Sequence, residues 1–236
     1  MFTNHPIQFA VAVAFAAAST LSVAHGRTPR VPPPAEFEYV TINVEQNATD
    51  GDTEVVITAK AGDEGLHTLS IKTPNRRHVA HVLSLDRSMM GLREFVFESP
   101  EPPGEAILAA YPEGKYTFNG VSSIGERFRS QAVLSHELPA PVTILHPAQD
   151  AEVGTDSLTI QWSAVTGISQ YVVEFENESA DPEQILRIDV PASQTSFEIP
   201  ASMLVPGADY QVGVWTVATN GNISVTETTF STVESR

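Results

Sequence analysis

Hydrophobic and polar residues alternate in short runs from residue 37 to the end of the chain. Val40, Ile42 and Val44 are separated by single polar residues, which is the period of a half-buried β-strand. An Asp-Gly dipeptide within residues 47–52 then predicts a tight turn. Residues 105–111 are the only helix that we expect, because an acidic residue begins this run and a proline follows it. Further strands are expected around residues 55–59 and over residues 66–72, 78–85, 93–99, 115–121 and 127–134.

The spacing of the predicted strands becomes regular after a proline-containing boundary at residues 138–142 (LPAPV). Leu158 and Trp162 lie on one face of a predicted strand, as inward-facing residues of a sandwich do. Seven strands are expected in this part, over residues 142–146, 157–163, 170–176, 184–190, 195–200, 208–218 and 223–232. The chain is therefore predicted to be all-β, with two tandem antiparallel β-sandwich-like domains at residues 37–139 and 140–236.

A Pro-Gly turn at residues 206–207 leads into a strand with Tyr210 at its corner. A tyrosine at such a corner buries its ring in a sandwich core, while its hydroxyl group hydrogen-bonds the preceding loop. The other residues that form a recognisable set with this corner are Pro147, Trp162, Tyr171, Leu204 and the Asn220-Gly221-Asn222 turn. On these residues, the segment 141–236 resembles a fibronectin type III domain.

The resemblance implies a seven-stranded, immunoglobulin-like sandwich that serves as a spacer or an interaction module. It assigns structural roles to Trp162, Tyr171, Leu204 and Tyr210. No Arg-Gly-Asp tripeptide occurs in the chain, so the integrin-binding role of some family members does not transfer. Residues 37–139 resemble no family by motif.

The N-terminus differs in composition from the rest of the chain. Residues 9–24 are apolar or small and uncharged, and this run is shorter than the about 20 apolar residues that a membrane-spanning helix needs. Residues 1–24 are predicted to be a signal peptide that is cleaved after Ala24 or Gly26. A retained membrane anchor is the alternative, because no Lys or Arg precedes the apolar run. The mature protein is expected to be secreted or periplasmic without inserting into a membrane, and residues 25–36, with four prolines, to be an extended linker.

Composition narrows the classes of function. The chain contains no cysteine, which excludes disulfides, Cys-based zinc sites and Cys nucleophiles. The net charge is −16, and residues 141–236 carry thirteen acidic residues against Arg187 and Arg236. Because such a surface repels phosphate backbones, nucleic acid is not an expected partner. The chain is predicted not to be an enzyme, since residues 120–125 (GVSSIG) are one residue too long for a nucleophile elbow and other hydrolase motifs are absent.

Asp50 and Asp52 are the candidate metal ligands of the sequence. A calcium ion takes about six to eight oxygen ligands, and the Asp-Gly-Asp sequence supplies few and matches no EF-hand loop. A turn is therefore the preferred interpretation, and calcium is the only cofactor left open. His78 and His81 are three residues apart on a predicted strand, so without a bulge they are expected to point to opposite faces and not to bind one ion.

Three residues are candidates for an interface. Arg76 and Arg77 lie at the tip of a predicted hairpin in an acidic protein, where they contact either solvent or an anionic partner such as a polysaccharide. Trp215 is expected to face outward, because Tyr210 and Val212 on the same strand face inward. An exposed tryptophan is a frequent interface anchor, although a neighbouring domain or the long side chains of its own sheet would also cover it.

The predicted function is that of an exported, non-enzymatic protein that acts outside the cytoplasm as a spacer or binds a protein or a polysaccharide. Two alternatives remain open at this stage. One is an accessory component of a carbohydrate-active system, in which the N-terminal domain contacts the glycan. The other is a hydrolase with an unrecognised carboxylate site, because the distances between acidic residues are not readable from sequence. The oligomeric state is not predicted.

Overall fold

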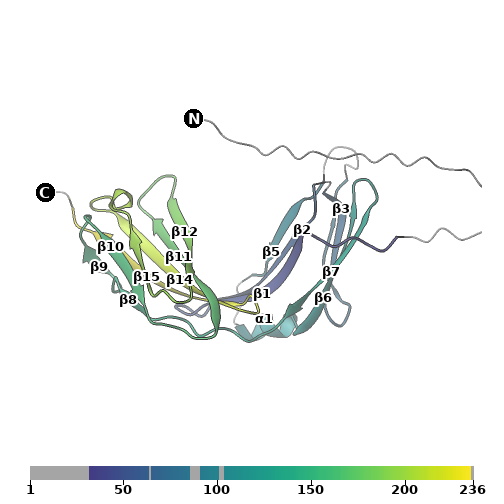
Figure 1. The fold of residues 1–236 in the computed structure, drawn as a ribbon, viewed down its shortest axis with the longest axis horizontal. Helices are drawn as coiled ribbons and strands as arrows, with labels where there is room; N and C mark the ends of the chain where they lie inside the picture. The colour runs from purple at the N-terminus through teal and green to yellow at the C-terminus, as the bar shows by residue number, and fades with distance from the viewer. Residues whose placement is uncertain (1–31, 64, 86–90, 101–103, 235–236) are drawn as a thin grey trace, which may run out of the picture. The chain divides into compact units, whose positions relative to one another are not determined.

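The computed structural model describes residues 32–63, 65–85, 91–100 and 104–234 (Figure 1). Their regular secondary structure is nearly all β-strand, as the alternating pattern predicts. The predicted signal peptide and most of the predicted proline-rich linker lie outside them. Residues Pro34–Arg236 form one compact unit. Within the described ranges, no helix has the length and the apolar character needed to cross a lipid bilayer.

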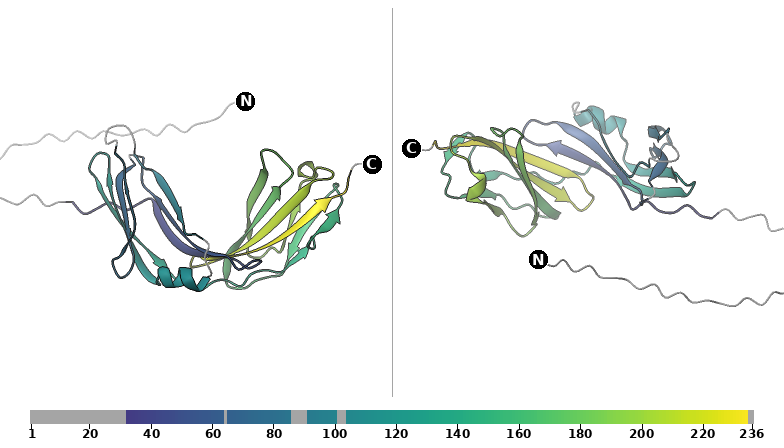
Figure 2. Two further views of the ribbon diagram at one scale, coloured as in Figure 1. Left: turned by 180° about the vertical axis from the view of Figure 1, so that it is seen from behind. Right: turned by 90° about the horizontal axis from the view of Figure 1, so that it is seen from above.

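Two facing sheets built from strands β1 to β7 form what we call the N-terminal sandwich. Its elements are β1 (Tyr39–Asn47), β2 (Thr53–Lys60), β3 (Leu66–Lys72), β4 (His78–Leu83), β5 (Glu94–Glu98), α1 (Gly104–Ala110), β6 (Gly114–Ser122) and β7 (Arg127–Leu134). Strands β1, β2 and β5 are neighbours in one sheet, and the other sheet has the order β4-β3-β6-β7. The helix α1 contacts β2 (Figure 2).

The core of the N-terminal sandwich is mainly aliphatic. Alternation along β2 buries Val55 and Ile57, while Glu54 faces away from the core. Phe37 packs edge-to-face on Phe118, with ring centroids 6.4 Å apart. The other fully buried large side chains of this core are Tyr116, Leu66, Leu69, Ile71 and Leu134. The β-sandwich fold expected for this part of the chain is therefore present, while the bounds 37–139 stay a prediction.

Strands β8 to β15 form a second pair of facing sheets, which we call the C-terminal sandwich. Its elements are β8 (Ile144–His146), β9 (Ala151–Val153), β10 (Leu158–Trp162), β11 (Ile168–Asn177), β12 (Gln184–Pro191), β13 (Ser196–Ile199), η1 (Ala201–Met203), β14 (Asp209–Ala218) and β15 (Ile223–Thr232). One sheet has the order β13-β10-β8, and the other contains β12-β11-β14-β15. All seven expected strands form, and the short β9, which pairs in parallel with β15, is an addition to them.

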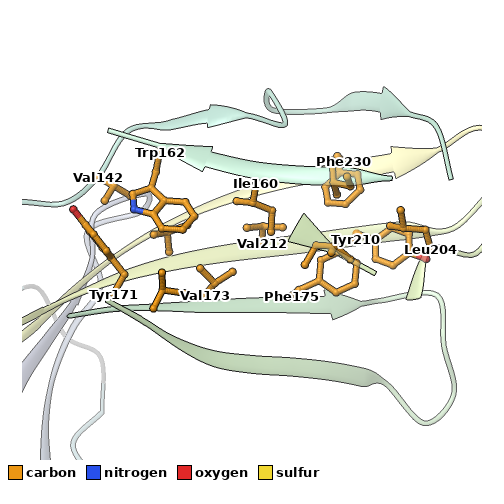
Figure 3. Packing of buried hydrophobic residues seen from close by; sticks show 14 of the residues in the cluster. Val142, Ile160, Trp162, Tyr171, Val173, Phe175, Leu204, Tyr210, Val212 and Phe230 are labelled. Carbon is orange, nitrogen blue, oxygen red and sulfur yellow. The ribbon is translucent and has the colours of Figure 1, made fainter. Parts of the chain in front are cut away.

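Aromatic side chains lie at both ends of the core of the C-terminal sandwich. Figure 3 shows Trp162 projecting from one sheet toward the other, where its ring meets Tyr171 edge-on at a centroid distance of 5.4 Å. At the other end of this core, Tyr210 stacks between Phe175 at 5.0 Å and Phe230 at 5.2 Å. The two groups close the ends of one continuous hydrophobic core.

The two sandwiches share a sheet. Strand β1 pairs in parallel with β15, with Glu45 opposite Ile223 and Asn47 opposite Val225. The shared sheet therefore has the order β12-β11-β14-β15-β1-β2-β5. Residues 135–143 carry no strand and contain the boundary predicted at residue 140, which stays a prediction.

The turn before β15 fastens this junction. Asn222 is 1% exposed, and its side-chain oxygen accepts a hydrogen bond from the Val44 backbone N–H at 2.8 Å. Its amide nitrogen donates to the carbonyl oxygens of Ser135 at 2.8 Å and Glu137 at 2.9 Å. One buried side chain therefore satisfies backbone groups from two other segments of the chain.

Candidate functional site

Tyr210 and Tyr171 have architectural roles. The Tyr210 hydroxyl donates to the Met203 carbonyl oxygen at 3.1 Å and accepts from the Val205 N–H at 2.6 Å. The Tyr171 hydroxyl accepts from the Val165 N–H at 2.7 Å. Both rings are fully buried, so these tyrosines fix loops and offer nothing to a ligand. The other two residues expected to be structural, Trp162 and Leu204, lie in the same core.

Trp215 lies on the outward face of β14 and is half-buried. The Arg187 guanidinium lies over its ring, 3.7 Å from the centroid, and Arg187 is also 3.4 Å from the Glu174 carboxylate. Gly213 leaves room for the indole, because a Cβ at this position would be 3.1 Å from the Trp215 Nε1 atom. A cation that packs on the ring and pairs with a carboxylate holds the indole in one orientation. Trp215 is thus a fixed, partly exposed aromatic group.

The side chains next to Trp215 are of two kinds. A hollow of about 160 Å³ adjoins the ring and is lined from β1, β2 and β15. Ile223 and Val225 give this hollow an apolar part, and Glu45 and Glu54 give it an acidic part. Such a combination suits a ligand group that is apolar along one side and cationic at another.

Glu45 has an altered acidity in this hollow. Desolvation raises the pKa of its carboxyl group above the ordinary value. Two smaller effects oppose the rise: a hydrogen bond from Asn43, 2.8 Å from the Glu45 carboxylate, and the charge of Arg187. Glu54 stands directly opposite Glu45 in the β1–β2 ladder. The acidic part of the hollow is therefore partly withdrawn from water.

Asp50 belongs to the turn between β1 and β2. Its carboxylate accepts a hydrogen bond from the Asp52 N–H at 2.9 Å, and the Asn47 side-chain oxygen accepts from the Thr49 N–H at the same distance. Both contacts are those of Asx turns. Across the described ranges, no group of three or more His, Asp or Glu residues is placed to hold a metal ion. Nothing in this turn supports calcium binding by Asp50 and Asp52.

Arg76 and Arg77 have different roles, although they are adjacent in sequence. The Arg77 guanidinium donates to the Ala110 carbonyl oxygen at 2.6 Å and so caps the C-terminal end of α1. Arg76 lines a groove beside the four-stranded sheet and has a backbone φ of 66°. The hairpin tip expected at this point is present, since the Arg76 N–H donates to the Thr73 carbonyl oxygen at 2.9 Å. Only Arg76 is available to a ligand in the groove.

The groove beside Arg76 lies on the outward face of the β4-β3-β6-β7 sheet and has a volume of about 540 Å³. Its other cations are Lys72 on β3, Lys115 on β6 and Arg129 on β7. Hydroxyl and amide side chains on the same strands, those of Thr117, Asn119 and Gln131, separate the cations. The groove thus offers several hydrogen-bond donors and a positive potential on a protein of strongly negative net charge.

His78 and His81 lie on the same side of β4, so the expectation that they point to opposite faces is wrong. His81 is opposite Ser70 on β3, and His78 is opposite Lys72, which leaves Val79 as an extra residue in a bulge. Their ring centroids are 6.2 Å apart. Because the bulge adds one residue to the strand, two side chains that are three positions apart point to the same face.

Sequence reasoning missed Lys72, Lys115 and Arg129. Each is an outward residue of a different strand, and the three lie far apart in sequence. Their alternation with inward residues such as Phe118 was readable as a polar face. The pairing that brings the three strands together was not readable from the sequence. The groove depends on that pairing, because it is assembled across β3, β6 and β7.

Comparison with known protein families gives a match in the C-terminal sandwich. Residues 146–232, less than half of the chain, match the family model of the fibronectin type III domain. A search of curated proteins found no match. Solved structures with this fold match the chain at low sequence identity.

The FN1–FN3 domains of chicken CNTN1 share 14% identity with the chain, with a TM-score of 0.34, and the match covers 85% of this chain and 65% of that one. An Fn3-like protein from Clostridium thermocellum shares 17% identity over 42% of this chain and 99% of its own, with a TM-score of 0.30. A two-domain fibronectin type III segment of chicken tenascin shares 14% identity over 80% and 95%, with a TM-score of 0.29. The chain spans slightly less than two thirds of the CNTN1 segment. The resemblance expected for residues 141–236 is confirmed, and residues 146–232 are a fibronectin type III domain.

Proposed function

We propose that the protein is an exported, non-enzymatic binding module that recognises a protein partner outside the cytoplasm through the sheet face around Trp215. The observation that carries this proposal is the fixed, partly exposed indole of Trp215, held by Arg187 next to apolar and acidic side chains. Buried aromatic anchors with a polar rim are the usual energetic centre of protein interfaces.

The family supports the general class of this function. Fibronectin type III domains are generally scaffold or binding modules without catalytic groups. The finer assignment rests on the shared sheet, whose outward face carries Trp215 together with residues from both sandwiches. Export rests on the apolar, uncharged segment 9–24.

The charge of this face indicates the chemistry of the partner. Glu45, Glu54 and Glu174 lie around the tryptophan, and Arg187 is already paired with Glu174. A partner surface with an apolar centre and Lys or Arg at its rim complements this arrangement. Such charges raise the rate of association at low ionic strength and exclude acidic partners.

Affinity capture with the full chain as bait, followed by measurement with the purified partner, tests the proposal. Trp215→Ala is expected to weaken binding of that partner by about tenfold or more, because it removes the anchor. Leu145→Ala is the matched control, since Leu145 is 60% exposed on β8 in the other sheet. Equal affinities for the parent, the Trp215 variant and the Leu145 variant would place the interface elsewhere, and an acidic partner would contradict the charge argument.

A hydrolase is a second candidate function, and Glu45 is the specific observation that favours it. A carboxyl group whose pKa is raised by desolvation, opposite a second carboxyl group, is the kind of pair that glycosidases use. An activity screen with polysaccharide substrates tests this alternative. Turnover that is lost in Glu45→Gln but retained in Glu98→Gln would favour the enzyme over the binding module.

A further inference from the structure

We infer that the groove on the outward face of the β4-β3-β6-β7 sheet is a second binding site, separate from the face around Trp215, and that it takes an acidic polysaccharide. The inference does not depend on the proposed protein partner, because the two surfaces lie on different sheets.

The first argument concerns charge. Four of the 13 basic residues of the chain, Lys72, Arg76, Lys115 and Arg129, line this one groove of about 540 Å³. The salt bridges seen in the described part of the chain use Lys60, Arg93 and Arg187, so none of the four groove cations forms a salt bridge with a described carboxylate. Like charges that gather without a partner repel one another. An anionic ligand in the groove would relieve that repulsion.

The second argument concerns the order of side chains across the strands. Lys72 stands opposite Thr117, and Thr117 stands opposite Gln131, so these three form a row across β3, β6 and β7. In the next row, Asn119 stands opposite Arg129. Neighbours within a row are separated by the strand spacing of about 4.8 Å. A polymer lying along a row therefore meets a cation and then hydrogen-bonding groups at steps close to the length of a sugar ring.

This mixture of groups favours a polysaccharide over other polyanions. A polymer of acidic sugars presents many hydroxyl groups for each carboxylate or sulfate, which matches amide and hydroxyl side chains set between cations. The groove lining contains no aromatic side chain on which a nucleic-acid base would stack. It also contains no large apolar side chain that would enter a lipid interface, since Pro74 is its one apolar residue.

The third argument concerns the backbone at Arg76. With φ at 66°, Arg76 occupies the left-handed region, which favours glycine and is uncommon for a residue with a Cβ atom. Glycine at this tip would relieve the strain. An arginine that occupies a strained position at the edge of a basic groove indicates a role for its side chain rather than for its backbone.

Binding of polygalacturonate to the full chain, measured by affinity electrophoresis or calorimetry, tests the inference. The double variant Lys115→Gln/Arg129→Gln is expected to bind about tenfold more weakly, and raising the salt concentration from about 50 to about 300 mM is expected to weaken binding of the parent protein. The double variant Lys60→Gln/Arg93→Gln is the charge-matched control, because Lys60 pairs with Glu38 and Arg93 pairs with Asp63, and neither cation lines the groove. Equal losses in the groove variant and the control would overturn the inference.

Two further variants separate an effect on ligand binding from an effect on folding. Arg76→Gly is expected to weaken binding while leaving the melting temperature unchanged or raised, which a purely structural arginine would not do. Glu36 lines a neighbouring hollow together with Arg129, so Glu36→Gln is expected to strengthen binding. Unchanged affinity in both variants would contradict the assignment of the groove.

Other probes decide the ligand class. Neutral dextran is expected not to bind, and poly-L-glutamate and single-stranded oligo(dT) are expected to bind more weakly than polygalacturonate at equal salt. Tighter binding of either acidic polymer, or equal binding of dextran, would overturn the polysaccharide assignment.

Discussion

The two sandwiches fill their cores in different ways. The C-terminal core is closed at each end by a tyrosine whose hydroxyl hydrogen-bonds a loop, Tyr171 with Val165 and Tyr210 with Val205. The N-terminal core has one such tyrosine, Tyr116, whose hydroxyl donates to the Pro112 carbonyl oxygen at 3.1 Å. Aromatic residues with fixed hydrogen bonds cannot be exchanged without loss, whereas aliphatic residues replace one another readily. The C-terminal core therefore holds more residues of fixed identity, and it is the C-terminal sandwich that is recognisable from its sequence.

The outward surfaces of the two sandwiches also differ, in their charge. The face around Trp215 is acidic with an apolar centre, and the groove of the N-terminal sandwich is basic. The interior of the C-terminal sandwich is recognisable from its sequence, but the surface around Trp215 is not. Strands β1 and β2 of the N-terminal sandwich contribute to this surface, and only the structure shows that they do. Inward residues identify the fold, and outward residues carry the two proposed binding sites.

The largest expected effect comes from Asn222, where the two sandwiches meet. Asn222→Ala removes the bonding partner of the Val44 N–H and of the Ser135 carbonyl oxygen, while the Glu137 carbonyl oxygen keeps its bond from Asn220. The substitution is expected to cost about 2–4 kcal/mol of unfolding free energy. Chemical denaturation followed by tryptophan fluorescence and by circular dichroism measures it. Asn220→Ala removes two bonds of an exposed side chain, one donated to the Glu137 carbonyl oxygen and one accepted from the Asn222 N–H, and is expected to cost about 1 kcal/mol or less. An Asn222 variant as stable as the Asn220 variant would mean that the junction does not couple the sandwiches.

Overpacking of the N-terminal core ranks second. A Cβ at Gly120 would come within 2.9 Å of Leu66 Cδ2 and 3.1 Å of Phe37 Cζ, so Gly120→Ala is expected to cost about 1–3 kcal/mol. Thermal unfolding measures the change. Gly154→Ala, where no atom lies within 4 Å of the added Cβ, is expected to change stability by about 0.5 kcal/mol or less. A tolerated Gly120→Ala would show that the aliphatic core adjusts more easily than its packing indicates.

Removal of a buried hydroxyl group compares the two cores directly. Tyr210→Phe keeps the stacked rings but loses the bonds to Met203 and Val205, at an expected cost of about 0.5–1.5 kcal/mol. Tyr116→Phe loses one bond and is expected to cost less. Urea titration of both variants gives the two values. A larger loss at Tyr116 than at Tyr210 would reverse the proposed difference between the cores.

The smallest effect is expected at Glu45. Because desolvation raises the pKa of Glu45 in the folded state, its carboxylate opposes folding at neutral pH, and this cost disappears as the pH falls through that pKa. Glu45→Gln is therefore expected to be neutral or stabilising at pH 7, by about 1 kcal/mol or less, and to lose this advantage in acid. Melting temperatures at about pH 7 and about pH 4 test the sign. Destabilisation at neutral pH would mean that the bond from Asn43 outweighs desolvation.

Much of the fold is readable from sequence because alternation reports which side of a strand is buried. The strand that contains Val55 and Ile57 and the corner at Tyr210 are examples. The parallel pairing of β1 with β15 was not predictable, since it joins residues such as Glu45 and Ile223 that are far apart in the chain. Local periodicity contains no information about such long-range pairing.

The binding surfaces were less predictable than the fold. The outward position of Trp215 follows from alternation, but its stacking with Arg187 depends on strand register across two other strands. Arg76 and Arg77 are adjacent arginines, so the sequence does not distinguish their roles. Only the position of α1 shows that Arg77 caps a helix. The bulge at Val79, which places His78 and His81 on one face, leaves no signal in the residue pattern.

The parallel pairing of β1 with β15 also protects the protein from uncontrolled association. An edge strand with free N–H and C=O groups is a template for pairing with other chains. β1 covers β15 from Ile223 to Val225, the Thr49 hydroxyl receives the Glu227 N–H, and β9 covers the strand from Phe230 to Thr232. The free edges of the shared sheet are then β12, which ends at a proline, and β5, a five-residue strand with a glutamate at each end. A C-terminal sandwich produced without β1 would expose part of β15, and its tendency to aggregate would reveal how much of the solubility of the protein comes from its N-terminal strands.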